Sequence, residues 1–211
     1  MTGVQTCALP ICKAKKSVGN ITLCYTKRKN IARAKVFSRK DNPTPEVLVQ
    51  RAKLGLLVRM VRPFLPVLRK SFVGIGKGSA SNAFVACNMK AVTVDEQYAA
   101  TVDFARLSVA SGILNPPKVT VAYDEEEESF QFMQEVQPEE DGYAFFDDRV
   151  YGVLYETERN RSRLVVLKNR GESGITSYAL PDEWDASKVE VYAFALQKNG
   201  RAASDSVHLT V

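Results

Sequence analysis

The second half of the chain consists of short runs in which apolar and polar residues alternate, and this pattern constrains the fold most. Alternation with a period of two places apolar side chains on one face of a β-strand. Turn-forming residues separate the runs at nearly regular intervals, and Asn199-Gly200 is a hairpin signal before the last one. Seven or eight such strands predict an antiparallel β-sandwich of the immunoglobulin or fibronectin-III-like type. The runs begin at Asp103 and read DFARLSVASG, KVTVAYD, ESFQFMQ, RVYGVLYET, SRLVVLKN, GITSYALP, KVEVYAFALQ and ASDSVHLTV.

A helix-favouring stretch, Asp41–Lys70, comes before these runs. Thr44 suits the N-cap position, and Pro45 suits the first helical position, where its missing N–H leaves no hydrogen bond unmade. Apolar residues then recur at helical spacing, which predicts a helix with one buried stripe. The stripe comprises Val47, Leu54, Leu57, Val58 and Val61.

Two prolines interrupt this stretch. Because proline lacks a backbone N–H and clashes with the preceding turn, we expect Pro63 to end or kink the helix near Val61. Phe64–Phe72 then restarts as a second amphipathic segment, with Pro66 in its first turn. This pattern predicts a helical hairpin packed on a sheet. A DNA-reading helix-turn-helix is the alternative, although such a turn often contains glycine and this one is formed around Pro63.

A turn rich in glycine, Gly74–Ser79, follows the helical stretch. It lacks the full G-x-x-x-x-G-K-[ST] spacing and follows a helix rather than a strand, so it does not indicate a nucleotide site. Ser81–Lys90 then predicts a short helix with Ser79 or Ser81 as its cap.

The segment before the helical stretch is basic and strand-like. Val18–Tyr25 and Ile31–Val36 predict the two strands of a β-hairpin, and Gly19-Asn20 suggests a bulge within the first strand. The basic residues alternate with apolar ones, so we expect them to occupy one solvated face. This face is the candidate binding surface, and it comprises Lys27, Arg28, Lys29, Arg33, Lys35, Arg39 and Lys40.

Residues 1–11, MTGVQTCALPI, match letter for letter the translation of a common short-read sequencing adapter, with a GTG start read as Met. We therefore set residues 1–12 apart as an artefact and its junction, and we expect that the natural N-terminus is missing. The remaining chain divides by charge and pattern into two predicted domains. Residues 13–90 form a basic hairpin with helices, and residues 91–211 form an acidic sandwich.

The charges of the chain are strongly segregated. Cys12–Lys90 holds 18 Lys and Arg against two acids, a net charge of +16, whereas Ala91–Val211 holds 11 against 22, a net charge of −11. Such asymmetry indicates an acidic partner for the first region, or binding of the two regions to each other. No apolar run approaches the ~18–20 residues needed to cross a bilayer, so we expect no membrane span.

No pattern for catalysis or metal binding stands out. With residues 1–12 set apart, only Cys24 and Cys87 remain, which form neither a disulfide framework nor a C-x-x-C metal motif. The single histidine, His208, excludes a site of several histidines. The acidic run Asp124–Glu128 could bind calcium, but D-x-D-x-D-G spacing is absent. Trp184 is expected to fill a corner of the sandwich rather than bind a sugar or a base.

Three patterns resemble an uncharacterised bacterial protein family, a domain of unknown function. They are a K-x-x-x-G-N strand at Lys15–Asn20, an N-P-x-T helix start with Q-R-A-K at Asn42–Lys53, and an S-x-N-A-F-V-x-x-N helix at Ser79–Asn88. The ending VYAFALQKNGRAASDSVHL, Val191–Leu209, also fits the β-sandwich of that family. The helix start is more loosely similar to phage-like structural proteins. The resemblance implies fold and boundaries, and it supplies no functional residues.

These observations favour a non-enzymatic structural or interaction protein, an assembly or adhesion-type component of phage or surface origin. A protein partner or self-association is expected, because the basic and acidic regions complement each other. A nucleic-acid-binding module that uses the basic residues is the alternative. An enzyme is the third possibility, but no carboxylate pair can be given a role, so we expect no enzyme and no cofactor.

Overall fold

A computed structural model describes residues 15–26, 28–38, 41–74 and 78–211. Residues 1–12 and the centre of the glycine-rich turn, 75–77, lie outside the described residues. The chain divides into two compact units, Met1–Pro43 and Thr44–Val211. The predicted fold class, α+β and mainly β, is confirmed. We expected the helices to belong with the basic strands, but both helices belong to the unit that contains the sandwich, because they share a core with it.

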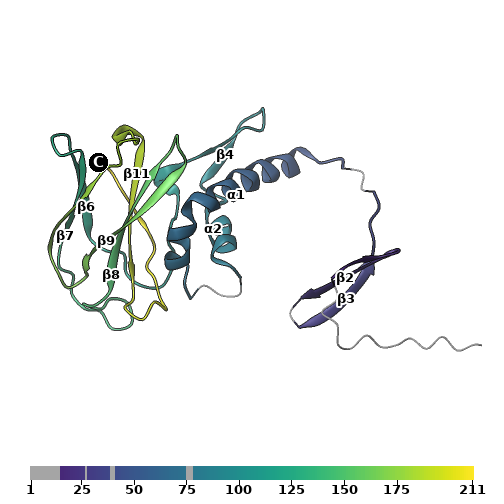
Figure 1. Ribbon diagram of the computed structural model, residues 1–211, viewed down its shortest axis with the longest axis horizontal. Coiled ribbons are helices and arrows are strands. Elements are labelled where there is room, and N and C mark those ends of the chain that lie inside the picture. Colours follow the sequence, from purple (N-terminus) through teal and green to yellow (C-terminus); the bar gives the residue numbers. More distant parts are fainter. Residues whose placement is uncertain (1–14, 27, 39–40, 75–77) are drawn as a thin grey trace, which may run out of the picture. The chain divides into compact units, whose positions relative to one another are not determined.

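The first unit contains a three-stranded antiparallel sheet (Figure 1). Its strands are β1 (Lys16–Val18), β2 (Ile21–Thr26) and β3 (Lys29–Ala34), in that order. We expected one strand from Val18 to Tyr25 with a bulge at Gly19-Asn20. This expectation was wrong, because those two residues form the turn between β1 and β2, where Gly19 takes a φ of +56°. Glycine adopts that backbone conformation without steric cost.

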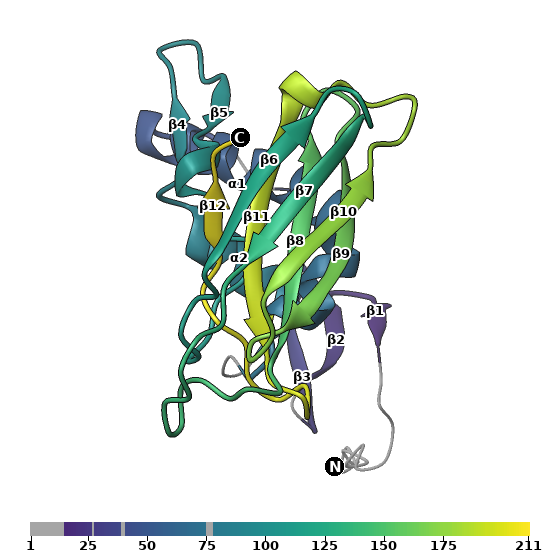
Figure 2. The same cartoon turned by 90° about the vertical axis from the view of Figure 1, so that its left-hand side faces the viewer.

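The second unit contains the predicted antiparallel sandwich. One sheet has the order β10-β7-β6 and the other the order β12-β11-β8-β9 (Figure 2). Its strands are β6 (Val119–Asp124), β7 (Ser129–Gln134), β8 (Arg149–Glu156), β9 (Arg161–Asn169), β10 (Gly174–Ala179), β11 (Val189–Leu196) and β12 (Val207–Leu209). Short 3-10 helices span Phe104–Arg106 and Ala186–Lys188.

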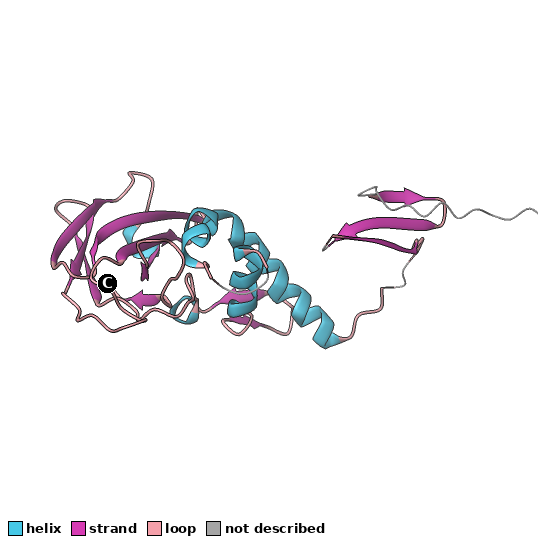
Figure 3. Cartoon of the chain, turned by 90° about the horizontal axis from the view of Figure 1, so that it is seen from below, coloured by secondary structure: helices cyan, strands magenta, loops and turns pink. Residues whose placement is uncertain are grey.

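Two α-helices form a third layer beside the four-stranded sheet (Figures 1 and 3). They are α1 (Pro45–Ser71) and α2 (Ala80–Asn88), and a hairpin of β4 (Val92–Val94) and β5 (Ala100–Val102) follows them. Ser79 caps α2 by accepting a hydrogen bond from the Asn82 N–H at 3.2 Å. The order of layers in this unit is therefore three-stranded sheet, four-stranded sheet and helices.

The four-stranded sheet is buried on both faces. Toward the three-stranded sheet, Val150 and Leu154 of β8 pack in a core with Phe132 of β7. Toward the helices, Tyr151 and Val153 of the same strand pack in a second core that includes Phe64 and Phe84. Seven of the eight residues of β8 are buried, as are seven of the eight residues of β11.

The helix α1 runs through both prolines, so the predicted break at Pro63 and the predicted helical hairpin are wrong. A proline inside a helix costs about 3 kcal/mol. The turns around these prolines bury Phe64, Val67 and Leu68 completely, and each such side chain contributes roughly 1.5–3 kcal/mol. The Ser162 hydroxyl on β9 also donates to the Pro63 carbonyl at 2.7 Å. Tertiary packing therefore holds a helix that local sequence disfavours.

The predicted buried stripe of α1 is only partly correct. Leu57 is fully buried, but Val47, Leu54 and Val58 are 41%, 48% and 54% exposed. The buried residues lie mainly toward the C-terminal end of α1, where the helix meets the sheet. Val47 and Leu54 instead line a shallow groove of about 300 Å³ together with Met89.

Two glycine substitutions test this packing. A Cβ at Gly152, in the centre of β8, would lie 2.8 Å from Cε1 of Phe132, so we expect Gly152→Ala to lower the free energy of unfolding by about 1–3 kcal/mol. Gly55 is the matched control, because a Cβ on this exposed position of α1 meets nothing within 4 Å. Gly55→Ala should raise the free energy of unfolding by about 0.5–1 kcal/mol. Urea unfolding of both variants measures it, and a Gly152→Ala protein as stable as the parent would contradict the two-sided burial of β8.

Candidate functional site

One face of the three-stranded sheet carries cations. Lys29 and Arg33 of β3 pair with Thr26 and Thr22 of β2, so the alternation of the strands places both basic residues on the same face. Lys35 continues this alternation, because its backbone N–H donates to the Asn20 carbonyl at 2.7 Å. The face that carries Lys29, Arg33 and Lys35 is called the basic face below. Ile31, which is 41% exposed, lies on the same face between Lys29 and Arg33.

The other candidate residues fall elsewhere. Arg28 lies in the turn between β2 and β3, with a φ of +62°. Lys27, Arg39 and Lys40 lie outside the described residues. The structure therefore brings three of the seven predicted residues onto one surface and places a fourth at its end.

The opposite face of the same sheet is mainly apolar, although Lys16 of β1 pairs with Leu23 on that face. Val18 of β1 pairs with Ile21 of β2, and Leu23 and Ile21 of β2 pair with Ala32 and Ala34 of β3. Val18 is 71% exposed and Ile21 is 49% exposed. This apolar face was missed as a candidate surface, although the alternation of Val18, Ile21 and Leu23 in the sequence was its signal.

The first unit has no buried core of its own among the residues described. No residue of 15–25 or 28–38 is buried, and every residue of β3 is exposed. The unit also holds ten Lys and Arg against one acid, a net charge of +9 over residues 1–43. A sheet of this size ordinarily needs a covered hydrophobic face to be stable. Among the described residues, this unit therefore covers neither its exposed apolar side chains nor its cations.

Three titratable groups of the second unit are partly buried or paired with a neighbour. Burial raises the pKa of Tyr155 to about 12, and its hydroxyl donates to the Asn160 side chain at 2.7 Å. His208, the one histidine, lies 2.7 Å from Glu190, and burial raises the pKa of the Cys87 thiol. Among the described residues no group of three or more His, Cys, Asp or Glu side chains could hold a metal ion. No described helix is long and apolar enough to cross a membrane.

A buried ion pair fixes one end of the sandwich. The side chains of Arg170 and Asp148 are both inaccessible to solvent, and Arg170 Nε lies 3.1 Å from Asp148 Oδ2. The guanidinium also donates to Gln137 Oε1 at 2.8 Å and to the Asn115 carbonyl at 2.7 Å. Burial lowers the pKa of Arg170, and the charge of Asp148 opposes this effect. The pair thus ties together the segments before β6, before β8 and after β9.

A comparison with protein-family models finds a match over nearly the whole chain. The model of a family of unknown function (DUF6266) matches residues 13–210. The chain belongs to this family. The resemblance to an uncharacterised family is therefore confirmed, and the matched range of this DUF6266 member spans both units up to the last strand. No curated protein and no solved structure matches the chain.

Removing one partner of the buried ion pair should destabilise this DUF6266 member strongly. Arg170→Met leaves the Asp148 carboxylate buried without its counter-charge, which should lower the free energy of unfolding by about 3–5 kcal/mol. Arg106→Met is the control, because Arg106 is exposed in the second unit, and it should change stability by no more than about 0.5 kcal/mol. Adding Asp148→Leu to Arg170→Met should restore part of the loss, because no uncompensated charge then remains. Thermal and urea unfolding measure all three proteins, and equal stability of the two single variants would contradict this role.

Proposed function

We propose that this chain is a non-enzymatic interaction protein of the assembly or adhesion type, which binds a protein partner through its three-stranded basic sheet. One observation carries the proposal: none of residues 15–25 and 28–38 is buried, so neither face of this sheet is covered within its unit over those residues. Exposed apolar residues and clustered cations on one small sheet are features of a surface that binds a partner.

Charge complementarity favours a second copy of the chain as that partner. The first unit carries +9, whereas residues 44–211 hold 19 Lys and Arg against 23 acids, a net charge of −4. Four consecutive acids, Glu125–Glu128, are exposed in the turn between β6 and β7. A contact between the basic sheet of one copy and the acidic surface of the next is heterologous and can propagate.

The strand order of the second unit supports the immunoglobulin-like or fibronectin-III-like interpretation. Lettered A to G from β6 to β12, the sheets read E-B-A and G-F-C-D. The sheets thus share the A-B-E and C-F-G groupings of immunoglobulin-like domains, with the fourth strand beside the third. Sandwiches of this kind serve many surface and adhesion proteins, and this analogy adds to the proposal.

Light scattering on the nuclease-treated full chain tests self-association. We expect assemblies at about 0.1 M salt that dissociate at about 1 M, because the screening length of charges falls from about 10 Å to about 3 Å. Lys29→Glu with Arg33→Glu should abolish the assemblies. Arg106→Glu with Lys118→Glu makes the same change in charge on the exposed surface of the second unit and should weaken assembly less. A monomer at both salt concentrations and at high protein concentration would contradict self-association.

The second candidate function is nucleic-acid binding. The basic face carries cations without an acid among the described residues of its sheet, and Phe37 is 70% exposed with Lys35 Nζ 5.2 Å from its ring centroid. Cations that contact phosphates beside an aromatic ring that stacks on a base are typical of single-strand binding. Titration with DNA and RNA at about 0.1 M salt tests this, and affinity should fall steeply with salt. Failure of single- and double-stranded forms alike would exclude this function.

A further inference from the structure

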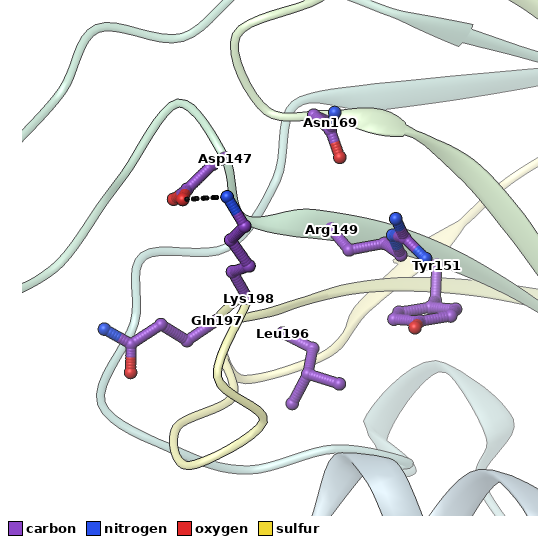
Figure 4. Close-up of a pocket in the computed structure, with 7 residues that line it drawn as sticks. All are labelled: Asp147, Arg149, Tyr151, Asn169, Leu196, Gln197 and Lys198. Carbon is purple, nitrogen blue, oxygen red and sulfur yellow. Dashed lines mark ion pairs between the residues drawn. The ribbon is translucent and has the colours of Figure 1, made fainter.

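A small pocket lies at the end of the sandwich where β8 begins and where β9 and β11 end. It encloses about 240 Å³, and Figure 4 shows its lining side chains. Arg149 and Tyr151 come from β8, Asn169 comes from the end of β9, and Lys198 follows β11. The Arg149 side chain extends toward the Tyr151 ring, while Lys198 lies across the pocket and reaches Asp147 (Figure 4).

Positive charge is in excess around this pocket. Lys70 of α1 lies behind Tyr151, with its Nζ 4.8 Å from the ring centroid and 3.5 Å from the hydroxyl. Asp147 is the one acid among the lining residues, and it pairs with Lys198 at 3.4 Å. Arg149 has no ion-pair partner among the residues that the structure describes. A concave surface lined by charge of one sign concentrates ions of the opposite sign.

The walls of the pocket are held in place from behind. Asp148 and Arg170, the buried ion pair, are the chain neighbours of Asp147 and Asn169. Tyr151 is 4% exposed and stacks on Phe194 with 5.4 Å between ring centroids. The pairing register of β8 with β9 shifts between Arg149 and Tyr151, and such bulges commonly re-aim a side chain beside a binding site. The Tyr151 ring and the backbone that carries Arg149 are therefore held by neighbouring strands.

We propose that this pocket binds the oxyanion group, carboxylate or phosphate, of a small acidic molecule. The Arg149 guanidinium presents the paired N–H donors that suit such groups. The Tyr151 hydroxyl accepts from Lys70, so its own hydrogen can be donated to the anion. Lys198 releases the Asp147 carboxylate and contacts the ligand instead, because the side chains of both residues are more than half exposed. A volume of about 240 Å³ fits a polycarboxylate or inorganic phosphate and is smaller than most drug-sized pockets, which begin at about 300 Å³.

Calorimetric titration of the full chain with citrate and, separately, with inorganic phosphate tests the proposal at low ionic strength. We expect saturable binding of at least one anion. Citrate alone would identify a carboxylate ligand, and phosphate binding would identify a phosphate ligand. Arg149→Gln should weaken binding by about tenfold or more, because it removes a charge-assisted contact. Arg106→Gln, which removes an exposed arginine remote in sequence from the lining segments, should leave the affinity unchanged.

Binding by the basic sheet of the first unit would give a different result. In that case Arg149→Gln and the parent protein would bind equally, which would overturn the proposal, as would the absence of binding by both anions. Side-chain amide resonances in the parent protein give a readout that does not depend on a variant folding. Those of Asn169 and Gln197, which both line the pocket, should shift on titration. Unshifted amides in the presence of a bound anion would place it elsewhere.

Discussion

The burial of the four-stranded sheet on both faces is the constraint on which the second unit depends. An antiparallel sheet commonly leaves one face to solvent, but β8 and β11 are covered by the other sheet on one side and by α1 and α2 on the other. Both layers are needed, because loss of the helices would expose Phe194 and loss of the three-stranded sheet would expose Val191. The helices therefore belong to the same folding unit as the sandwich, although at least 30 residues separate each from β6, the first strand of that sandwich.

The same constraint explains why the ends of these strands can form a defined pocket. Central strands that are fixed from both sides hold the residues at their ends with little freedom, so Arg149 and the residues after Leu196 start from fixed positions. The Arg170–Asp148 pair adds a second restraint by fixing the loop before β8 against the end of β9. Three separate segments thus line one small volume, and the fixed backbone at their ends lowers the cost of ordering the donors that bind an anion.

Much of the fold could be predicted from local patterns, because strands such as β6 carry their own alternation and Ser79 and Thr44 mark the helix starts. The continuity of α1 through Pro63 could not, since it depends on a sheet that lies about a hundred residues later in the chain. Nor could the pocket, because Lys70, Arg149, Asn169 and Lys198 share no spacing. One signal was overlooked: the nearly unbroken apolar runs of β8 and β11, VYGVLY and VYAFAL, indicate burial on both faces.

The two faces of the first-unit sheet make different demands on a partner. The basic face can be satisfied by any polyanion, including a nucleic acid, because phosphate contacts require only accessible cations. The apolar face, with Val18 and Ile21 largely exposed, gains free energy only when apolar surface covers it. A nucleic acid backbone meets the first demand and leaves the second unmet. A protein surface that combines apolar side chains with acids meets both, and this asymmetry is why we propose a protein partner ahead of a nucleic acid.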